Sequence, residues 1–90
     1  AFQRQVNDLA GLLGWLYYHT HRSDRSQPGF PDLVMVRRKR TIFAELKTER
    51  GVTSAPQKTW GDALVEAGAE FYLWRPSMFE EILETLKRGE

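Results

Sequence analysis

The architecture of this protein follows from residues 30–48, which read FPDLVMVRRKRTIFAELKT. Two runs of strand-forming residues, 30–37 and 41–48, flank the basic cluster 37–40. So short a separation leaves room only for a tight antiparallel reversal, which predicts a β-hairpin. The cluster contains no Asn-Gly or Asp-Gly pair, so a bulged loop of about three to five residues, with another register, stays open as an alternative.

The register of this hairpin decides which charged side chains meet. A turn centred between Arg38 and Lys39 pairs residues whose numbers sum to 77, so Asp32 faces Glu45 with Cβ atoms about 5 Å apart. Lys47 shares the face of Glu45, because side chains alternate along a strand. A slip of one residue would separate the three groups. The hairpin is therefore expected to hold two carboxylates and one ammonium on one face, inside its strands.

Two neighbouring carboxylates repel each other, and a cation between them removes the conflict. The sequence has no cysteine, and carboxylate oxygens suit magnesium or manganese. The backbone carbonyl of Leu46 is a further candidate ligand, and Lys47 is placed to orient an activated water and offset developing charge. An ordinary ladder of surface charges is the alternative. Against it, both faces of the strands are apolar, which predicts a sheet covered on both sides.

Several short motifs along the chain carry a family resemblance. They are Gly29-Phe30-Pro31-Asp32-Leu33, Phe43-Ala44-Glu45-Leu46-Lys47-Thr48, and then Gly51, Ser54 and Gln57. Together they resemble the PD-(D/E)xK nuclease superfamily and, within it, the VRR-NUC (virus-type replication-repair nuclease) family, over nearly the whole chain. The resemblance implies a restriction-endonuclease-like fold in which Asp32 and Glu45 bind metal and Lys47 is the catalytic lysine. It also implies that Gln57 helps to position the scissile phosphate or the attacking water.

The start of the first helix departs from this family pattern. Members often carry a glutamate just ahead of a Phe-Gln pair, where this sequence has Ala1 before Phe2-Gln3. Asp8 is the only acid in that helix and is not assigned to the site. Two functions therefore stay open: an active nuclease, and a DNA-binding module of the same fold with little or no turnover.

Helical and strand periods along the chain predict one domain, residues 1–90, with the order αβββαβα. Capping boxes at Ser54–Gln57 and Ser77–Glu80 open two of its helices, and Gln57 is either a pure cap or a site residue. Trp60, Ala63, Leu64 and Ala67 are expected to form the buried stripe of the middle helix. Helices then flank both faces of a mixed four-stranded sheet. The expected elements are a helix at 2–13, strands at 15–19, 30–37, 41–48 and 70–74, a helix at 54–67 and a final helix from 77.

Charge is distributed unevenly along the chain. Residues 1–60 contain ten Lys/Arg and five Asp/Glu (+5), whereas residues 61–90 contain three and seven (−4). The basic part would attract the phosphates of DNA, although the cluster 37–40 also suits a soluble hairpin tip. His19 is included among the expected DNA-contacting residues because members of the resembled family are similar at this position. The expected DNA-contacting residues are His19, Arg22, Arg25, Arg37, Arg38, Lys39, Arg40, Arg50 and Lys58.

These features lead to one expected function. The chain is expected to be a magnesium- or manganese-dependent DNA endonuclease that acts on branched or structured DNA, such as four-way junctions or flaps, because nothing in it is dedicated to sequence recognition. By analogy with stand-alone members of the family, it is expected to form a homodimer. The absence of cysteine and of any long apolar run favours the cytoplasm of a bacterial or phage-infected cell and gives no membrane association.

Overall fold

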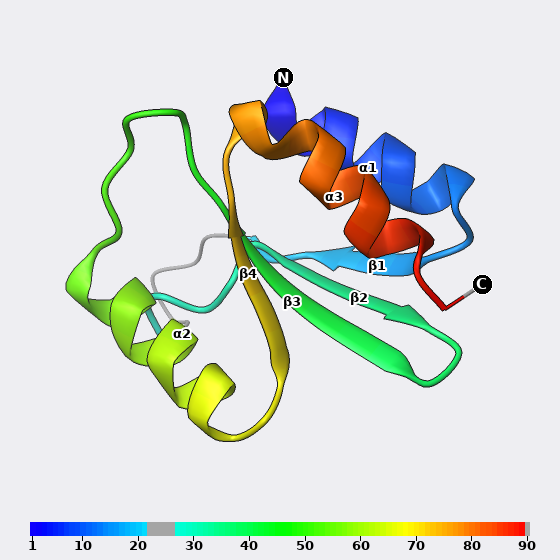
Figure 1. Cartoon of the computed structure of the whole chain (residues 1–90). Helices are drawn as coiled ribbons and strands as arrows, with labels where there is room; N and C mark the ends of the chain where they lie inside the picture. The colour runs from blue at the N-terminus through cyan, green and yellow to red at the C-terminus, as the bar shows by residue number, and fades with distance from the viewer. Residues whose placement is uncertain (22–26, 90) are drawn as a thin grey trace.

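The structure is a computed structural model of the chain and describes residues 1–21 and 27–89. The predicted order of three helices and four strands is confirmed (Figure 1). A short 3₁₀ turn, η1, is added before the last helix. The elements are α1 (Phe2–Leu12), β1 (Leu16–His19), β2 (Leu33–Arg37), β3 (Arg40–Leu46), α2 (Ala55–Glu66), β4 (Glu70–Trp74), η1 (Pro76–Met78) and α3 (Phe79–Lys87).

The four strands form one mixed sheet in the order β1-β2-β3-β4. β1, β2 and β3 are antiparallel neighbours, and β4 runs parallel to β3 after the crossover through α2. Val34 pairs with Phe43 and Arg37 with Arg40, so the predicted register is confirmed and the bulged alternative is wrong. The turn consists of Arg38 and Lys39, and Arg38 takes a left-handed φ of 55°.

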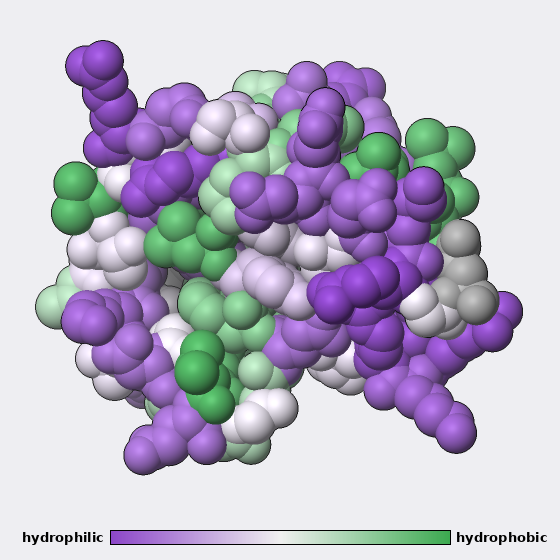
Figure 2. All heavy atoms as spheres, viewed as in Figure 1, coloured by the Kyte–Doolittle hydropathy of each residue, from purple (hydrophilic) through white to green (hydrophobic). Residues whose placement is uncertain are grey.

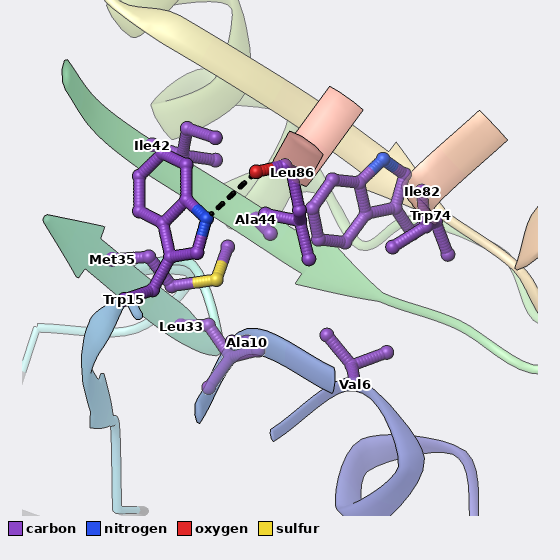
Figure 3. Close-up of a cluster of buried hydrophobic side chains, with 10 residues drawn as sticks. All are labelled: Val6, Ala10, Trp15, Leu33, Met35, Ile42, Ala44, Trp74, Ile82 and Leu86. Atoms are coloured by element: carbon purple, nitrogen blue, oxygen red, sulfur yellow. Dashed lines mark hydrogen bonds between the residues drawn. The ribbon is translucent and has the colours of Figure 1, made fainter. Parts of the chain in front are cut away.

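One side of the sheet, here called the core face, is covered by α1 and α3 together (Figure 1). Strand alternation directs Leu33 and Met35 of β2, and Ile42 and Ala44 of β3, to this face. Trp15 lies among them, and its indole Nε1 donates a hydrogen bond to the Leu86 carbonyl of α3 at 3.0 Å (Figure 3). The core thus joins the start of β1 to the last helix, 71 residues later.

The opposite side, here called the α2 face, is only half covered. α2 packs against β4, where Gly61 lies directly on the Phe71 ring and Trp60 meets Phe30 edge-to-face at 5.0 Å. Gly61 is the buried residue of this helix, whereas Ala63 and Ala67 of the predicted stripe are exposed. The prediction that Ala63 and Ala67 are buried was therefore wrong. The close approach at Gly61 turns the helix so that residues 57, 60, 61 and 64 face the sheet.

Among residues 1–21 and 27–89, no helix lies over the β1–β2 half of the α2 face. Leu16 is 76% exposed, Tyr18 62% and Val36 40%. The expectation of a sheet covered on both sides is therefore wrong for this half. Two of the three helices share the core face, and the third lies over β3 and β4.

Only one of the two predicted capping boxes forms. Ser54 caps α2: its Oγ accepts from the Gln57 amide, and the Gln57 side chain accepts from the Ser54 amide. The box predicted at Ser77–Glu80 is wrong, because Ser77 lies inside η1 and α3 begins two residues later, after Met78. The Ser77 amide instead donates to the Glu49 carboxylate at 2.6 Å. No helix in the described part of the chain is long and apolar enough to cross a membrane.

Candidate metal and nucleic-acid site

The Pro31-Asp32 pair lies just before β2 and Lys47 just after β3, so these groups flank the hairpin ladder and are not inside it as predicted. The physical reason is the proline. The register places Pro31 opposite Leu46, and proline has no N–H to continue the ladder. The Pro31 carbonyl accepts from the Thr20 hydroxyl at 2.8 Å, and the Asp32 Oδ2 atom accepts from the Leu46 amide, also at 2.8 Å. The bond from Leu46 holds the Asp32 side chain on the hairpin.

The same proline affects the Leu46 carbonyl. The backbone of Lys47 points toward β4, since its amide donates to the Trp74 carbonyl at 2.9 Å, and the backbone of Leu46 therefore points toward the β2 side. Pro31 has no hydrogen to offer there. The carbonyl that the sequence predicts as a metal ligand thus lacks the ladder donor that a non-proline residue would provide.

Glu45 is a buried carboxylate in an unfavourable setting. It is 3% exposed, and its Oε1 atom is buried with no hydrogen-bond partner in the described part of the chain. Burial, followed by the charge of Asp32, raises the pKa of Glu45 to about 7, while the charge of Lys47 acts in the opposite direction. The Lys47 ammonium is 3.8 Å from Glu45 Oε2. Asp32, Glu45 and Lys47 are therefore brought together as the sequence predicts.

Gln57 connects this carboxylate to the start of α2. Its Nε2 atom donates to Glu45 Oε2 at 2.6 Å, and its Oε1 atom accepts from the Ser54 amide at 2.9 Å. From the sequence, Gln57 was either a helix cap or a site residue. In the structure its side chain fills both roles. Gln57 thereby fixes one oxygen of Glu45 and leaves the other without a partner.

Gly29 is a site-building residue to which the sequence assigned no role. Its φ is +90°, and a Cβ atom there would lie 2.4 Å from the Pro56 carbonyl carbon and 2.7 Å from the Gln57 amide nitrogen. Only glycine lets the segment before Asp32 run this close to the first turn of α2. The Pro28-Gly29 pair was a visible turn signal, but its packing partner lies 27 residues further along the chain and gave no local sign.

The loop between Lys47 and α2 is also held by residues that sequence reasoning missed. The Arg75 Nη1 atom donates to three backbone carbonyls, those of Thr48 at 2.6 Å, Glu49 at 3.2 Å and Gly51 at 2.8 Å. The Glu49 carboxylate in turn binds the Ser77 amide, which lowers its pKa. The end of β4 therefore clamps the turn that directly follows Lys47.

A hollow of about 240 Å³ opens beside Glu45 on the α2 face. Glu45 and Gln57 contribute its polar wall, and Phe71 and Leu73 part of its apolar wall. Hydrophobic side chains gather over α2 and β4 in Figure 2, whereas the region of α3 is mainly hydrophilic. Lys58, predicted to contact DNA, lies at this hollow and pairs with Asp62 at 3.0 Å, both well exposed. Arg50 is exposed in the clamped turn.

The basic cluster of the hairpin divides by strand alternation. Arg37 and Arg40 point to the core face, where both guanidinium groups lie over the Trp15 ring, at 4.6 and 5.1 Å. Arg37 donates to the Leu13 carbonyl after α1, and Arg40 to the Thr85 carbonyl of α3 and to Glu70, which raises the pKa of Arg40. These cations meet the negative ends of two helices.

The other two basic residues, Arg38 and Lys39, are exposed at the tip. They lie six residues along the strands from Asp32 and Glu45, a distance of about 20 Å. The basic tip and the carboxylates therefore occupy opposite ends of the hairpin.

His19 does not share the face of the carboxylates. It pairs with Leu33, so alternation places it on the core-face side, whereas Asp32 and Glu45 are on the α2 face. Its ring centroid lies 5.1 Å from that of His21, which follows the end of β1. Arg22 and Arg25, both predicted to contact DNA, lie outside the described residues.

Within residues 1–21 and 27–89, no group of three or more His, Cys, Asp or Glu side chains converges to hold a metal ion. The candidate site has two acids, Asp32 and Glu45, and a third protein ligand would be the Leu46 carbonyl. Comparisons with protein-family models, with curated proteins and with solved structures found no match.

Proposed function

We propose that this chain is a magnesium- or manganese-dependent DNA endonuclease of the VRR-NUC type that hydrolyses phosphodiester bonds in branched or structured DNA. The observation that carries the proposal is Glu45, a buried carboxylate next to Asp32 with one oxygen unpartnered. A divalent cation would remove both costs, the repulsion between the acids and the missing partner. The oxygen donors suit magnesium or manganese.

The residues that would hold the cation are Asp32, Glu45 and the Leu46 carbonyl. A bound divalent cation supplies charge stabilisation and a water of lowered pKa. The chain's own groups have separate tasks. Gln57 keeps Glu45 in one orientation through its 2.6 Å bond, and the Leu46 amide does the same for Asp32. Lys47, 3.8 Å from Glu45, contributes a positive charge where negative charge develops on the phosphate oxygens.

The test is cleavage of labelled four-way junction, flap and linear duplex side by side, with magnesium, with manganese and with EDTA. We expect metal-dependent cutting of a branched substrate that falls at least about 100-fold in Lys47→Ala and Asp32→Asn. Lys87→Ala is the control, because this lysine is an exposed cation on α3, away from the carboxylates, and should retain cutting. Equal rates for wild type and both site variants would refute the proposal.

The second candidate function is a DNA-binding module of the same fold with little or no turnover. It is favoured by the count of acids, since the described residues supply two and no third. In this case DNA binding weakens steeply with salt, and no substrate is cut with either metal. Calorimetric titration with Mn²⁺ shows whether the metal site exists when no cutting is seen. A chain that binds Mn²⁺ and DNA but cuts no substrate supports the second candidate.

We also propose that the protein works as a homodimer inside a bacterial or phage-infected cell, as its family resemblance implies. Paired cuts on a four-way junction need two copies related by a two-fold axis. Sedimentation velocity at micromolar concentration tests this part separately. A monomer that still cuts junctions would refute the homodimer proposal but not the nuclease proposal.

A further inference from the structure

The uncovered half of the α2 face leads directly away from the candidate site. The Thr20 amide donates to the Asp32 carbonyl at 2.8 Å, so Thr20, Asp32 and Glu45 form one row across three strands. Tyr18 belongs to the next row, and Leu16 pairs with Val36 in the row after it. We call this surface the open strip. Its side chains are Tyr18, Leu16 and Val36, followed by Arg38 and Lys39 at the hairpin tip.

The open strip is apolar along its length and charged at its far end. Tyr18, Leu16 and Val36 are neighbours on one face, and all three are exposed. Contiguous apolar side chains of this kind mark a binding surface more often than isolated ones do. Beyond them, Arg38 and Lys39 are exposed, unlike the two arginines beside them, which are bound to helix ends. The surface therefore offers a stacking platform and exposed cations in line with the carboxylates.

We infer that the open strip binds a single-stranded segment of nucleic acid, with a base stacked on Tyr18 and phosphates near Arg38 and Lys39. Aromatic side chains on a sheet face, combined with cations, bind unpaired bases, whereas paired bases are stacked inside the duplex and cannot reach them. The strip is about 20 Å long, which is enough for several nucleotides of an unpaired strand.

This inference rests on the proposed nuclease function and narrows its substrate class. A strand whose phosphate lies at Asp32 and Glu45 would continue over Tyr18, the exposed side chain of the next row. The preferred substrate is then a branched DNA with an unpaired arm, such as a flap, over a continuous duplex. A second copy of the chain is the competing occupant of the strip, and the experiment below distinguishes the two.

The structure provides a matched pair of variants on a single strand. Tyr17 and Tyr18 are adjacent in β1 and both exposed, at 46% and 62%, but they point to opposite faces. The probe is a fluorescein-labelled ten-nucleotide oligo-dT, with a duplex of equal length as the comparison, in EDTA and low salt. Binding is followed by fluorescence anisotropy, and urea unfolding checks that both variants are folded.

We expect Tyr18→Ala to weaken oligo-dT binding about ten-fold or more, the usual loss of one stacked base, and Tyr17→Ala to change it less than two-fold. Tyr18→Phe should restore binding, because the ring is what stacks. Duplex affinity should change less than two-fold in all three variants. Since metal and turnover are absent, this result stands even if the protein cuts nothing.

Three results would overturn the inference. The first is a wild type that binds no oligo-dT at low salt, and the second is an equal loss of oligo-dT affinity in Tyr17→Ala and Tyr18→Ala. The third is a wild-type dimer in sedimentation velocity that Tyr18→Ala converts to monomer with unchanged oligo-dT affinity, which would assign the strip to a second copy. If the chain cuts junctions but fails these tests, the proposed nuclease function stands and the inference that the open strip binds a single strand is refuted.

Discussion

Single residues of this protein carry most of what its site does. Glu45 is held by Gln57 on one oxygen and left without a partner on the other, beside the carboxylate of Asp32. An acid in this position is costly to the fold when it is ionised. Its setting is therefore expected to be visible in stability as well as in metal binding.

The pH dependence of stability should report Glu45. Its folded-state pKa of about 7 exceeds the usual 4.5, so the native state retains a proton that the unfolded chain has lost between these values. The free energy of unfolding should then fall as the pH rises from about 4.5 to about 7, by up to about 3 kcal/mol, and stay low above that. Urea unfolding in EDTA at pH 5, 6, 7 and 8 measures it.

Glu45→Gln isolates this contribution, because its side chain stays neutral. We expect the variant to lose the decrease and to be more stable than wild type at pH 8. Magnesium should stabilise the wild type more at pH 8 than at pH 5, and Glu45→Gln less than the wild type. Glu80→Gln, a change at an exposed acid of α3, is the control. A wild-type profile that is flat over this range would contradict the assigned burial of Glu45.

Gly29 shows how one backbone position sets a distance within the site. Gly29→Ala places a methyl group 2.4 Å from the Pro56 carbonyl carbon, so α2 has to move away from Asp32. Gly68→Ala is the matched control: its φ of +84° is similar, but no atom lies within 4 Å. We expect Gly29→Ala to lower the free energy of urea unfolding by about 1–3 kcal/mol more than Gly68→Ala does. Equal losses would mean that packing on α2 is unimportant.

Among the secondary-structure elements, the β2–β3 hairpin has two distinct ends. The Asp32 end holds the acids, and the opposite end is attached to the carboxyl ends of α1 and α3 through Arg37 and Arg40. Alternation along the strands sends these two arginines to the core face and leaves the turn residues exposed. The helix contacts give the tip a structural function that a basic cluster does not reveal by composition.

The turn of this hairpin should be improvable. Arg38 has a φ of 55°, which costs a non-glycine residue about 1–2 kcal/mol. We expect Arg38→Gly to leave stability unchanged or raise it by up to about 1 kcal/mol, whereas Lys39→Gly should lower it by about 0.5–1 kcal/mol. Thermal unfolding by circular dichroism compares them. The same loss in both variants would show that the left-handed residue is unstrained.

The loop after Lys47 should depend on Arg75, which binds three of its carbonyls. Arg75→Ala removes all three bonds and should speed hydrogen exchange of the Gly51 amide, which bonds within this turn. If the chain cuts DNA, its rate should fall as well, because Lys47 directly precedes the clamped turn. Exchange measured by NMR, with the Lys47 amide on the β4 ladder as internal reference, tests the clamp; unchanged exchange at Gly51 would contradict it.

The molecule as a whole separates its charges by face. The acids Glu80, Glu81 and Glu84 are exposed on α3, over the core face, and Arg38 and Lys39 are exposed at the tip beside the open strip. DNA is therefore expected to approach the α2 face and the hairpin tip, and to avoid α3.

The salt dependence of DNA binding should reflect this polarity. Replacing Arg38 and Lys39 together by alanine should reduce the slope of log K against log salt by about 1.4–1.8, since each lost phosphate contact contributes about 0.7–0.9. Anisotropy titrations between low and physiological salt measure the slope. Glu80→Gln with Glu84→Gln should leave it nearly unchanged, and an equal effect of the two double variants would contradict a one-sided approach.

Much of this fold could be predicted because its signals are local. Hairpin register follows from a turn between two apolar runs, and the Ser54–Gln57 cap from four adjacent residues. The prediction of a second capping box at Ser77–Glu80 was wrong because Pro76–Met78 form a 3₁₀ turn that includes Ser77. The buried stripe of α2 failed because it depends on where Gly61 meets Phe71, which is a long-range contact.

The amino-acid sequence by itself determined the order of elements, the pairing of Asp32 with Glu45, and the face shared by Lys47, because periodicity, turns and alternation act over a few residues. Tertiary structure decided which partners these groups have. It brought Gln57 to Glu45 and Gly29 to α2, directed Arg37 and Arg40 to helix ends, and left the β1–β2 half of one face open. The reason is that three helices have to divide between two sheet faces, and this choice depends on packing across the whole chain.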